Sequence, residues 1–296
     1  RSTLSPSSAP SDVYKRQVLK TYEAYGKDGA DATESVEDVP GTEEQISTET
    51  GEGTTGQVLQ NTQIENVSSL DATSHDWGLG SHTDDENRPL DAVNAQETYG
   101  KYNVYFIGDD TKDIYLTFDE GYEYGQTESI LNTLKEKGVS ATFFVTEPYA
   151  KDNPDLVRRM IDEGHVLGNH SVTHPSAGMP SLSLDKQENE VTENHAYIKE
   201  NFGYDMYLFR YPTGRFSEQS LALLNNCNYK SIFWSFAYLD YDVNNQPDHA
   251  SSLQKMKDKL HPGAIYLLHA ESETNAAVLG DFIDAVRAAG YGFKNF

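Results

Sequence analysis

The chain has 296 residues, a formal net charge of −24 at pH 7 and a hydrophobic fraction of 37%. A charge this negative argues against nucleic acid or an anionic membrane surface as a partner, because both bind through basic patches. The single cysteine, Cys227, excludes an internal disulfide and a zinc site built from cysteines, and no apolar run is long enough for a membrane-spanning helix.

The first 73 residues carry little of the apolar pattern that a core needs. Residues 1–17 form a Ser/Pro-rich string without an initiating Met and resemble a translated cloning or sequencing adapter. We exclude them from the fold, and we expect the native N-terminus to be missing. Residues 18–73 are rich in Glu, Asp, Thr, Ser and Gly, a composition that cannot bury enough apolar surface to fold. We expect a disordered acidic linker here, either a tether for a catalytic domain or a tolerated tail.

From Trp77 onward the composition changes, and from about residue 101 short apolar runs alternate with amphipathic ones. The predicted strands are 114–118, 141–145, 165–168, 207–210, 231–235 and 264–269. The predicted helices are 126–137, 155–163, 184–201, 217–225, 250–260 and 275–289. Repeated β-then-α units indicate a parallel sheet in an α/β protein. About seven strands that need cover on both faces favour a distorted (β/α) barrel over an open sheet.

Polar side chains stand at the C-terminal ends of the predicted strands, where barrels place their chemistry. They are Asp119 and Glu120 in TFDEG, His170 and His174 in NHSVTH, Arg210 in FRYPTGRFS, Trp234 and Asp240 in FWSFAYLDY, and His269 in IYLLHAES. Each alone has an ordinary explanation, such as a helix cap or an ion-pair partner. Together, two histidines and one carboxylate suit a three-ligand metal site, and a second carboxylate can then act as general base. A divalent cation would also remove the repulsion between the two adjacent acids.

In their order along the chain, TFDEG, HSVTH, RYPTGRFS, the Trp-Ser-x4-Asp-Tyr stretch and LLH resemble the five motifs of the polysaccharide deacetylases with a NodB homology domain (carbohydrate esterase family 4). The segments GYEYGQT and HPGAIYLLH resemble the PdaA-type group, the sporulation peptidoglycan N-acetylmuramic acid deacetylases. The resemblance implies a NodB-type barrel, with a catalytic domain at 74–296 and a NodB core at about 110–293.

The resemblance also implies a role for each matched residue in catalysis. Asp119 matches the catalytic base, and Arg210 matches the arginine that holds its carboxylate. His269 matches the general acid for the departing amine, and Asp240 matches the aspartate that tunes it. These four residues are the catalytic set that we predict.

One divalent metal ion is implied as cofactor, with Glu120, His170 and His174 as its ligands. Ligation by His and carboxylate suits Zn, and also Co, Mn or Ni. Glu120 stands where the family usually has a metal-binding Asp and where PdaA-like enzymes can have Asn. It therefore either reaches the metal in a shifted pose or leaves a site of two histidines and water.

Four further residues are implied to contact the substrate. Tyr211 matches the position whose backbone N–H stabilises the oxyanion, and Leu267 matches the lining of the acetate-methyl pocket. Trp234 is either a pocket wall or part of the core. Arg215 lies two residues after Thr213, where PdaA-like sequences can carry Arg, and we predict that it meets the lactyl carboxylate of muramic acid.

The implied activity is hydrolytic N-deacetylation of N-acetylmuramic acid in peptidoglycan glycan strands, on the way to the muramic δ-lactam of the spore cortex. Two alternatives stay open: the same chemistry on N-acetylglucosamine of peptidoglycan or chitin-like chains, and a barrel that binds glycans without catalysis. Binding alone needs neither a base nor an acid, which argues against the second alternative. We expect a monomer without nucleic acid or a nucleotide cofactor. Because murein lies outside the membrane, we also expect an exported, cell-wall protein of a bacterium.

Overall fold

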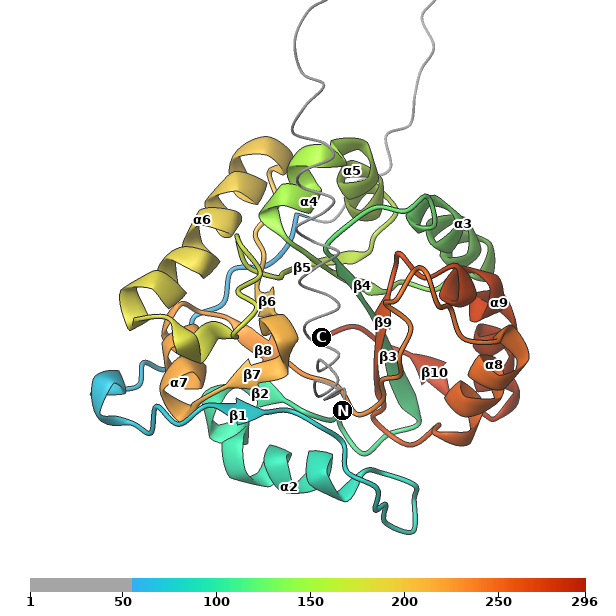
Figure 1. Cartoon of the computed structure of the whole chain (residues 1–296), viewed down its shortest axis with the longest axis horizontal. Helices are drawn as coiled ribbons and strands as arrows, with labels where there is room; N and C mark the ends of the chain where they lie inside the picture. The colour runs from blue at the N-terminus through green and yellow to red at the C-terminus, as the bar shows by residue number, and fades with distance from the viewer. Residues whose placement is uncertain (1–54) are drawn as a thin grey trace, which may run out of the picture. The chain divides into compact units, whose positions relative to one another are not determined.

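The computed structural model describes residues 55–296, and these form a curled parallel sheet with helices around its outside (Figure 1). In sheet order the strands are β10 (Gly292–Phe293), β3 (Asp113–Glu120), β4 (Thr142–Val145), β5 (Val166–Asn169), β6 (Leu208–Phe209), β8 (Lys230–Ile232) and β2 (Val104–Tyr105), and β9 (Ile265–His269) also pairs with β3. β10 pairs with the first residues of β3 on the edge that β4 occupies farther along, and β9 pairs with the opposite edge of β3. The predicted distorted (β/α) barrel of about seven strands is confirmed.

The helices of the described residues lie outside the curled sheet (Figure 1). They are α2 (Leu90–Tyr99), α3 (Thr127–Lys137), α4 (Glu147–Asp152), α5 (Pro154–Asp162), α6 (Leu184–Phe202), α7 (Glu218–Asn226), α8 (His249–Asp258) and α9 (Glu273–Ala288). Short 3₁₀ turns are η1 (Val67–Ser69), η2 (Gly100–Tyr102), η3 (Met179–Ser181) and η4 (Pro212–Gly214). None of the helices from residue 55 onward has both the length and the apolar character to cross a bilayer.

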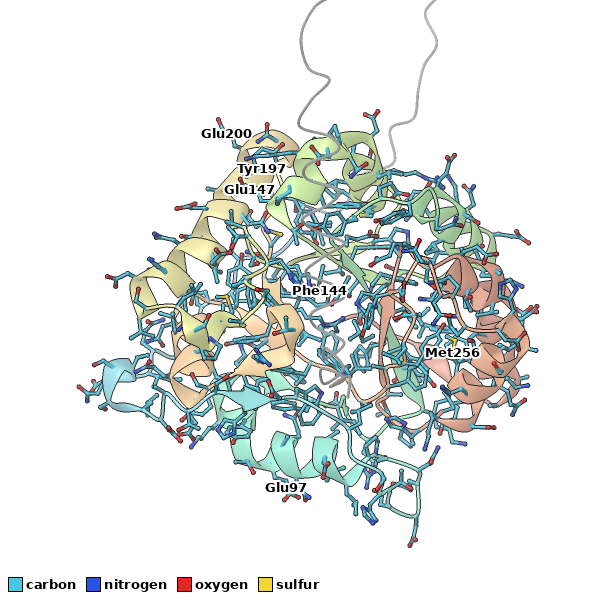
Figure 2. All side chains as sticks on the ribbon, viewed as in Figure 1. Glu97, Phe144, Glu147, Tyr197, Glu200 and Met256 are labelled. Carbon is cyan, nitrogen blue, oxygen red and sulfur yellow. The ribbon has the colours of Figure 1, made fainter. Side chains whose placement is uncertain are left out.

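Alternating side chains of the strands build two cores, one inside the barrel and one between the sheet and the helices. The inner core contains Tyr115, Phe144, Tyr207, Leu208, Ile232 and Ile265. Phe144 lies near the middle of the ring of strands in Figure 2, whereas Met256 lies in the helical layer. The outer core contains the strand residues that alternate with the inward-facing ones, among them Leu116 and Phe118 of β3. Along β3, Thr117 and Asp119 therefore face inward, and Phe118 and Glu120 face the helices.

Phe296 packs against the inner core at the N-terminal end of the barrel. The ring of Phe296 stacks on Tyr115 with ring centroids 4.2 Å apart. Its carbonyl oxygen accepts a hydrogen bond from the Tyr207 hydroxyl at 2.8 Å. This packing leaves the opposite end, where the strands finish, as the end that carries the polar side chains.

Residues 55–73 differ from the disordered linker that the composition predicts. Asn61 Nδ2 donates to the carbonyl oxygens of Asn225 and Tyr229, both at 3.0 Å, and Asn226 Nδ2 donates to Ile64 O at 2.8 Å. Asparagine side chains bond this segment to α7 and its C-terminal neighbour Tyr229, and Ile64, Val67 and Leu70 pack partly buried against the outer core. The domain therefore begins earlier than the predicted residue 74. The predicted adapter 1–17 and the linker up to residue 54 lie outside the described residues.

A final strand pair joins the N-terminal segment to the rim of the barrel. β1 (His75–Asp76) pairs antiparallel with β7 (Arg215–Phe216). Trp77 follows β1, and its indole Nε1 donates to the carbonyl oxygen of Trp234 at 3.0 Å. The pair therefore fixes Arg215 and Trp234 relative to the N-terminal segment.

Candidate active site

Asp119 is the last inward-facing residue of β3, and it is held by a buried arginine. Arg210 Nη1 donates to Asp119 Oδ1 at 2.9 Å and to Thr117 Oγ1 at 2.7 Å. The other guanidinium nitrogens donate to the carbonyl oxygens of Ile232 and Phe233, each at 3.1 Å. Because Arg210 is fully buried and bonded on all sides, the orientation of the Asp119 carboxylate is fixed.

The surroundings of Asp119 favour its charged form. Burial alone would raise the pKa of this carboxyl. The positive charge of Arg210, followed by the interactions with His170 and His269, outweighs burial and holds the pKa below the usual 3.8. Asp119 is therefore a carboxylate at neutral pH, the form that a general base needs.

His269 ends β9 directly beside Asp119, because the two residues are partners in the β3–β9 register. Its Nδ1 lies 2.8 Å from Asp240 Oδ1, and its backbone N–H donates to Asp240 Oδ2 at 2.9 Å. Asn275 Nδ2 donates to the same Oδ2 at 2.6 Å and so fixes the carboxylate. Burial would lower the pKa of His269, but the charge and hydrogen bond of Asp240 raise it to about 10. The ring is therefore an imidazolium at neutral pH, with Nδ1–H directed at Asp240.

His170 follows β5 and has the tautomer of a metal ligand. Its Nδ1 lies 2.9 Å from the carbonyl oxygen of Arg210 and must donate there, since a carbonyl only accepts. Burial lowers the pKa of His170, so the ring is neutral and Nε2 carries a lone pair. That Nε2 lies 3.5 Å from Asp119 Oδ2, which is also an acceptor. Two acceptors at this distance are favourable only when a cation or a proton lies between them.

His174 completes the pair of imidazoles. Its ring centroid is 4.8 Å from that of His170, with 68° between the ring planes. Burial, followed by the interaction with His170, lowers the pKa of His174 to about 3, so its ring is neutral too. Neutral imidazoles next to a carboxylate suit a divalent ion such as Zn²⁺, and the two histidines fit the metal that the motifs imply.

Glu120 lies apart from this pair, on the face of β3 that packs under the helices. It is fully buried, and neither carboxylate oxygen has a hydrogen-bond partner of ordinary geometry among the described residues. Burial, followed by the charges of Glu271 and Glu123, raises its pKa well above the usual value, and Tyr149 is also close. Between residues 55 and 296, no group of three or more His, Cys, Asp and Glu side chains is arranged to hold a metal ion. Ligation by Glu120 thus stays a prediction.

Two predicted substrate contacts lie beside the catalytic side chains. Leu267 precedes His269 by two residues on β9, so it shares the inner face, and it is 6% exposed. Tyr211 directly follows Arg210, and its buried ring stacks on Phe233 with centroids 5.3 Å apart. The Tyr211 side chain belongs to the core, so any contact with substrate has to come from its backbone.

Trp234 and Arg215 lie farther out on the rim. The ring of Trp234 is half-buried, packs against both cores and lies 5.9 Å from the Arg210 guanidinium. Arg215 Nε bonds to Asp76 Oδ1 at 2.5 Å, and both side chains are solvent-accessible. The structure thus brings together the four predicted catalytic residues and the two histidines, and it pairs Arg215 with an acid of the N-terminal segment.

The sequence patterns did not single out several residues that contact the catalytic side chains. Asn275 anchors Asp240, and the edge of the Tyr241 ring meets the ring of His269 at 5.5 Å between centroids. Glu271 is 6% exposed, and burial raises its pKa to about 7. The sequence points to Tyr241 and Glu271 only through their closeness to predicted catalytic residues. Tyr241 directly follows Asp240, and Glu271 follows His269 by two residues.

Comparisons with known proteins give the family. Residues 107–232 match the family model of polysaccharide deacetylase. The chain is 41% identical over 197 residues to peptidoglycan-N-acetylmuramic acid deacetylase PdaA of Bacillus subtilis (strain 168), covering 66% of this chain and 74% of that protein. It is 42% identical over 226 residues to an uncharacterized 30.6 kDa protein in the fumA 3' region of Geobacillus stearothermophilus, covering 75% of this chain and 84% of that protein. The solved structure of B. subtilis PdaA, a family 4 carbohydrate esterase, matches with a TM-score of 0.71 and 36% identity over 76% of this chain and 96% of that chain. The chain therefore belongs to the polysaccharide deacetylases (NodB homology domain, carbohydrate esterase family 4), hydrolases that act on the amide bonds of glycans.

Proposed function

We propose that the protein removes the acetyl group from N-acetylmuramic acid in peptidoglycan glycan strands, as a step toward the muramic δ-lactam of spore cortex. One observation carries the deacetylase chemistry: Asp119 and His269 are neighbours in the sheet, and their surroundings drive them to opposite charge states. Two adjacent titratable groups with separated pKa values are the usual arrangement of a general base and a general acid. The relative PdaA, named for action on N-acetylmuramic acid, supports the substrate.

In the proposed reaction, water attacks the acetamide carbonyl carbon. Asp119 takes the proton of the water through Oδ2, because Arg210 occupies Oδ1. The backbone N–H of Tyr211 stabilises the oxyanion, and Leu267 lines the space for the methyl group. His269 gives the Nε2 proton to the amine nitrogen as the C–N bond breaks, and acetate leaves. Asp240 keeps the His269 ring oriented throughout.

A divalent ion held by His170 and His174 would polarise the carbonyl and lower the pKa of the attacking water. Zinc suits these ligands, and Co, Mn and Ni are chemically acceptable alternatives. Whether Glu120 is a third ligand is a separate question, which a metal-affinity measurement on the Glu120→Gln variant addresses. The proposed site therefore rests on His170 and His174, and Asp119 beside them acts as the base.

The proposed partner is the glycan strand of murein, with the protein acting as a monomer. Because that substrate lies outside the cytoplasmic membrane, the proposed location is extracytoplasmic, at the cell wall. The substrate proposal includes Arg215, whose charge would meet the lactyl carboxylate of muramic acid. Arg215 has to share or leave its ion pair with Asp76 to do so, and an exposed pair of this kind is weak enough to exchange.

The test is incubation of the protein with amidase-treated murein, followed by digestion and mass spectrometry of the sugars. We expect the loss of acetyl from muramic acid and not from glucosamine. Arg215→Ala should lower the rate on this substrate by about 10-fold or more, the effect of one lost charged hydrogen bond. Arg158→Ala is the matched control, because Arg158 on α5 donates to the carbonyl oxygens of Asn201 and Phe202. Deacetylated glucosamine would support the alternative substrate, and an unchanged rate for Arg215→Ala would exclude its role.

A further inference from the structure

The loop that carries both histidines has an unusual backbone. Ser171 has φ 74 and His174 has φ 46, so two non-glycine residues adopt the left-handed conformation within four positions. Such conformations are sparsely populated by residues with a side chain and persist only where the surroundings enforce them. The direction of the two imidazoles therefore depends on whatever holds residues 171–174 in place.

The main anchor is a buried carboxylate on helix α6. Glu190 Oε2 accepts hydrogen bonds from the backbone N–H groups of Val172 and Thr173 at 3.0 and 2.8 Å. Its Oε1 accepts from the Thr173 hydroxyl at 2.6 Å. Glu190 is only 9% exposed, so the loop supplies the hydrogen bonds that water would otherwise give this carboxylate. Charge-assisted bonds of this kind are stronger than neutral ones.

A second anchor lies one helical turn further on. Asn194 Nδ2 donates toward Ser171 O at 3.2 Å and toward Asn169 Oδ1 at 2.9 Å. Ser171 Oγ in turn accepts from the backbone N–H of His174 at 3.0 Å. The spacing of four residues puts Glu190 and Asn194 on the same face of α6. Every residue from Ser171 to His174 is thus bonded to α6 directly or through Ser171.

We propose that Glu190, assisted by Asn194, is a positioning residue of the metal site, which locks the loop so that His170 and His174 face one ion. The proposal rests on the two-histidine metal site of the proposed function. Without Glu190 the amides of Val172 and Thr173 lose their acceptor, and His174 is free to leave its left-handed conformation. Ordering the loop would then oppose metal binding, so the affinity for the ion falls. Neither Glu190 nor Asn194 touches the ion or the substrate in this scheme.

The experiment measures Co²⁺ binding to the full chain from its visible absorption, together with hydrogen exchange of a peptide spanning residues 170–175 in metal-free protein. The variants are Glu190→Ala and Glu190→Gln, where Gln keeps an oxygen for the two amides. Glu188→Ala removes an exposed carboxylate of the same helix. Gln187→Ala removes a partly buried hydrogen bond to Leu182 O at 3.0 Å and controls for general loss of stability.

We expect Glu190→Ala to lower Co²⁺ affinity by about 10- to 100-fold, the usual effect of losing a group that orients metal ligands, and to speed exchange of the peptide. Glu190→Gln should stay within a few-fold of wild type, and Glu188→Ala and Gln187→Ala should bind normally. If Glu190→Ala does not fold, Thr173→Val takes its place, because it removes only the hydroxyl bond to Glu190. Thr173→Val should then weaken binding by a few-fold.

Two results would overturn the proposal. Wild-type affinity and wild-type exchange in Glu190→Ala, or in Thr173→Val where that variant decides, would refute it while leaving the deacetylase proposal intact. A wild-type chain that binds no Co²⁺ would refute it together with the metal part of the proposed function. Acetate release by that chain would then show whether the deacetylase activity itself stands.

Discussion

The substitution Asp240→Asn tests whether the Asp240 carboxylate keeps His269 charged. In the folded protein the pKa of His269 is raised from 6.5 to about 10, with its Nδ1 2.8 Å from Asp240 Oδ1. At about 1.36 kcal/mol per pH unit, this rise corresponds to roughly 5 kcal/mol in favour of the charged ring. Asn has nearly the same shape without the charge. The pKa of His269 in the variant should therefore fall toward 6.5, because burial lowers it and only the smaller effects of the Glu271 and Asp119 charges still raise it.

The expected signature is a pH-dependent loss of activity. With a pKa of 6.5, about 3% of His269 is protonated at about pH 8 and about 75% at about pH 6, whereas the wild type is protonated at both. The wild-type to variant ratio of kcat/KM should therefore be on the order of 20-fold larger at the higher pH. Asp240→Asn can also lower kcat/KM by changing the tautomer of His269. That loss cancels when the ratios at the two pH values are compared, provided that it is the same at both.

The assay is acetate release from peptide-free murein across the pH range, with Asp242→Asn as control. Asp242 follows Asp240 by two residues, but among residues 55–296 the carboxylate bonded to His269 is that of Asp240, so the loss of the Asp242 charge should leave the profile unchanged. A wild-type to Asp240→Asn ratio that is constant over the pH range would refute the assignment of His269 as an acid tuned by Asp240.

Three further substitutions address the framework of the site. Arg210→Met leaves the buried Asp119 unpaired and should reduce the unfolding free energy in urea by about 3–5 kcal/mol; an unchanged midpoint would contradict this account of the pair. Glu120→Gln should lower Co²⁺ affinity by more than about 100-fold if Glu120 is the third ligand, since losing a group that only orients ligands costs about 10- to 100-fold; a change of less than about 3-fold would contradict its ligation. Asn61→Ala should destabilise the domain by about 1–3 kcal/mol without altering kcat, because its side chain bonds to the backbone oxygens of Asn225 and Tyr229 and to none of the predicted catalytic residues; a kcat effect would contradict this.

The strongly patterned elements could be predicted from the sequence. The apolar runs of β3, β4 and β9 and the amphipathic pattern of α3 and α6 were placed to within a few residues. Helix α3 ends at Lys137, as predicted, and Gly138 follows with φ 60, a conformation that a glycine adopts without strain. Helix α4 was not predicted, because six residues are too few to show a helical period.

The sequence predicts which residues belong to the candidate site, but not how their side chains are arranged. Because Asp119 and Glu120 are adjacent in the sequence, the motif alone predicts one cluster of two carboxylates. The strand continues through Glu120, so the two-residue period of β3 sends the two carboxylates to opposite faces. A predicted strand that ended at Glu120 instead of Phe118 would have placed the two carboxylates on opposite faces by the same alternation. The contacts of Glu190 and the asparagine bonds of residues 55–73 were out of reach, because they join segments far apart in the chain.

The most direct test of the central claim is acetate release from peptide-free murein by the wild type and by Asp119→Asn. The substitution removes the proton acceptor while Arg210 can still bond the amide oxygen, so the fold is expected to survive. The account predicts acetate release by the wild type and a fall in kcat of about 100-fold or more for Asp119→Asn. Equal rates for the two proteins, or no acetate from the wild type, would contradict it.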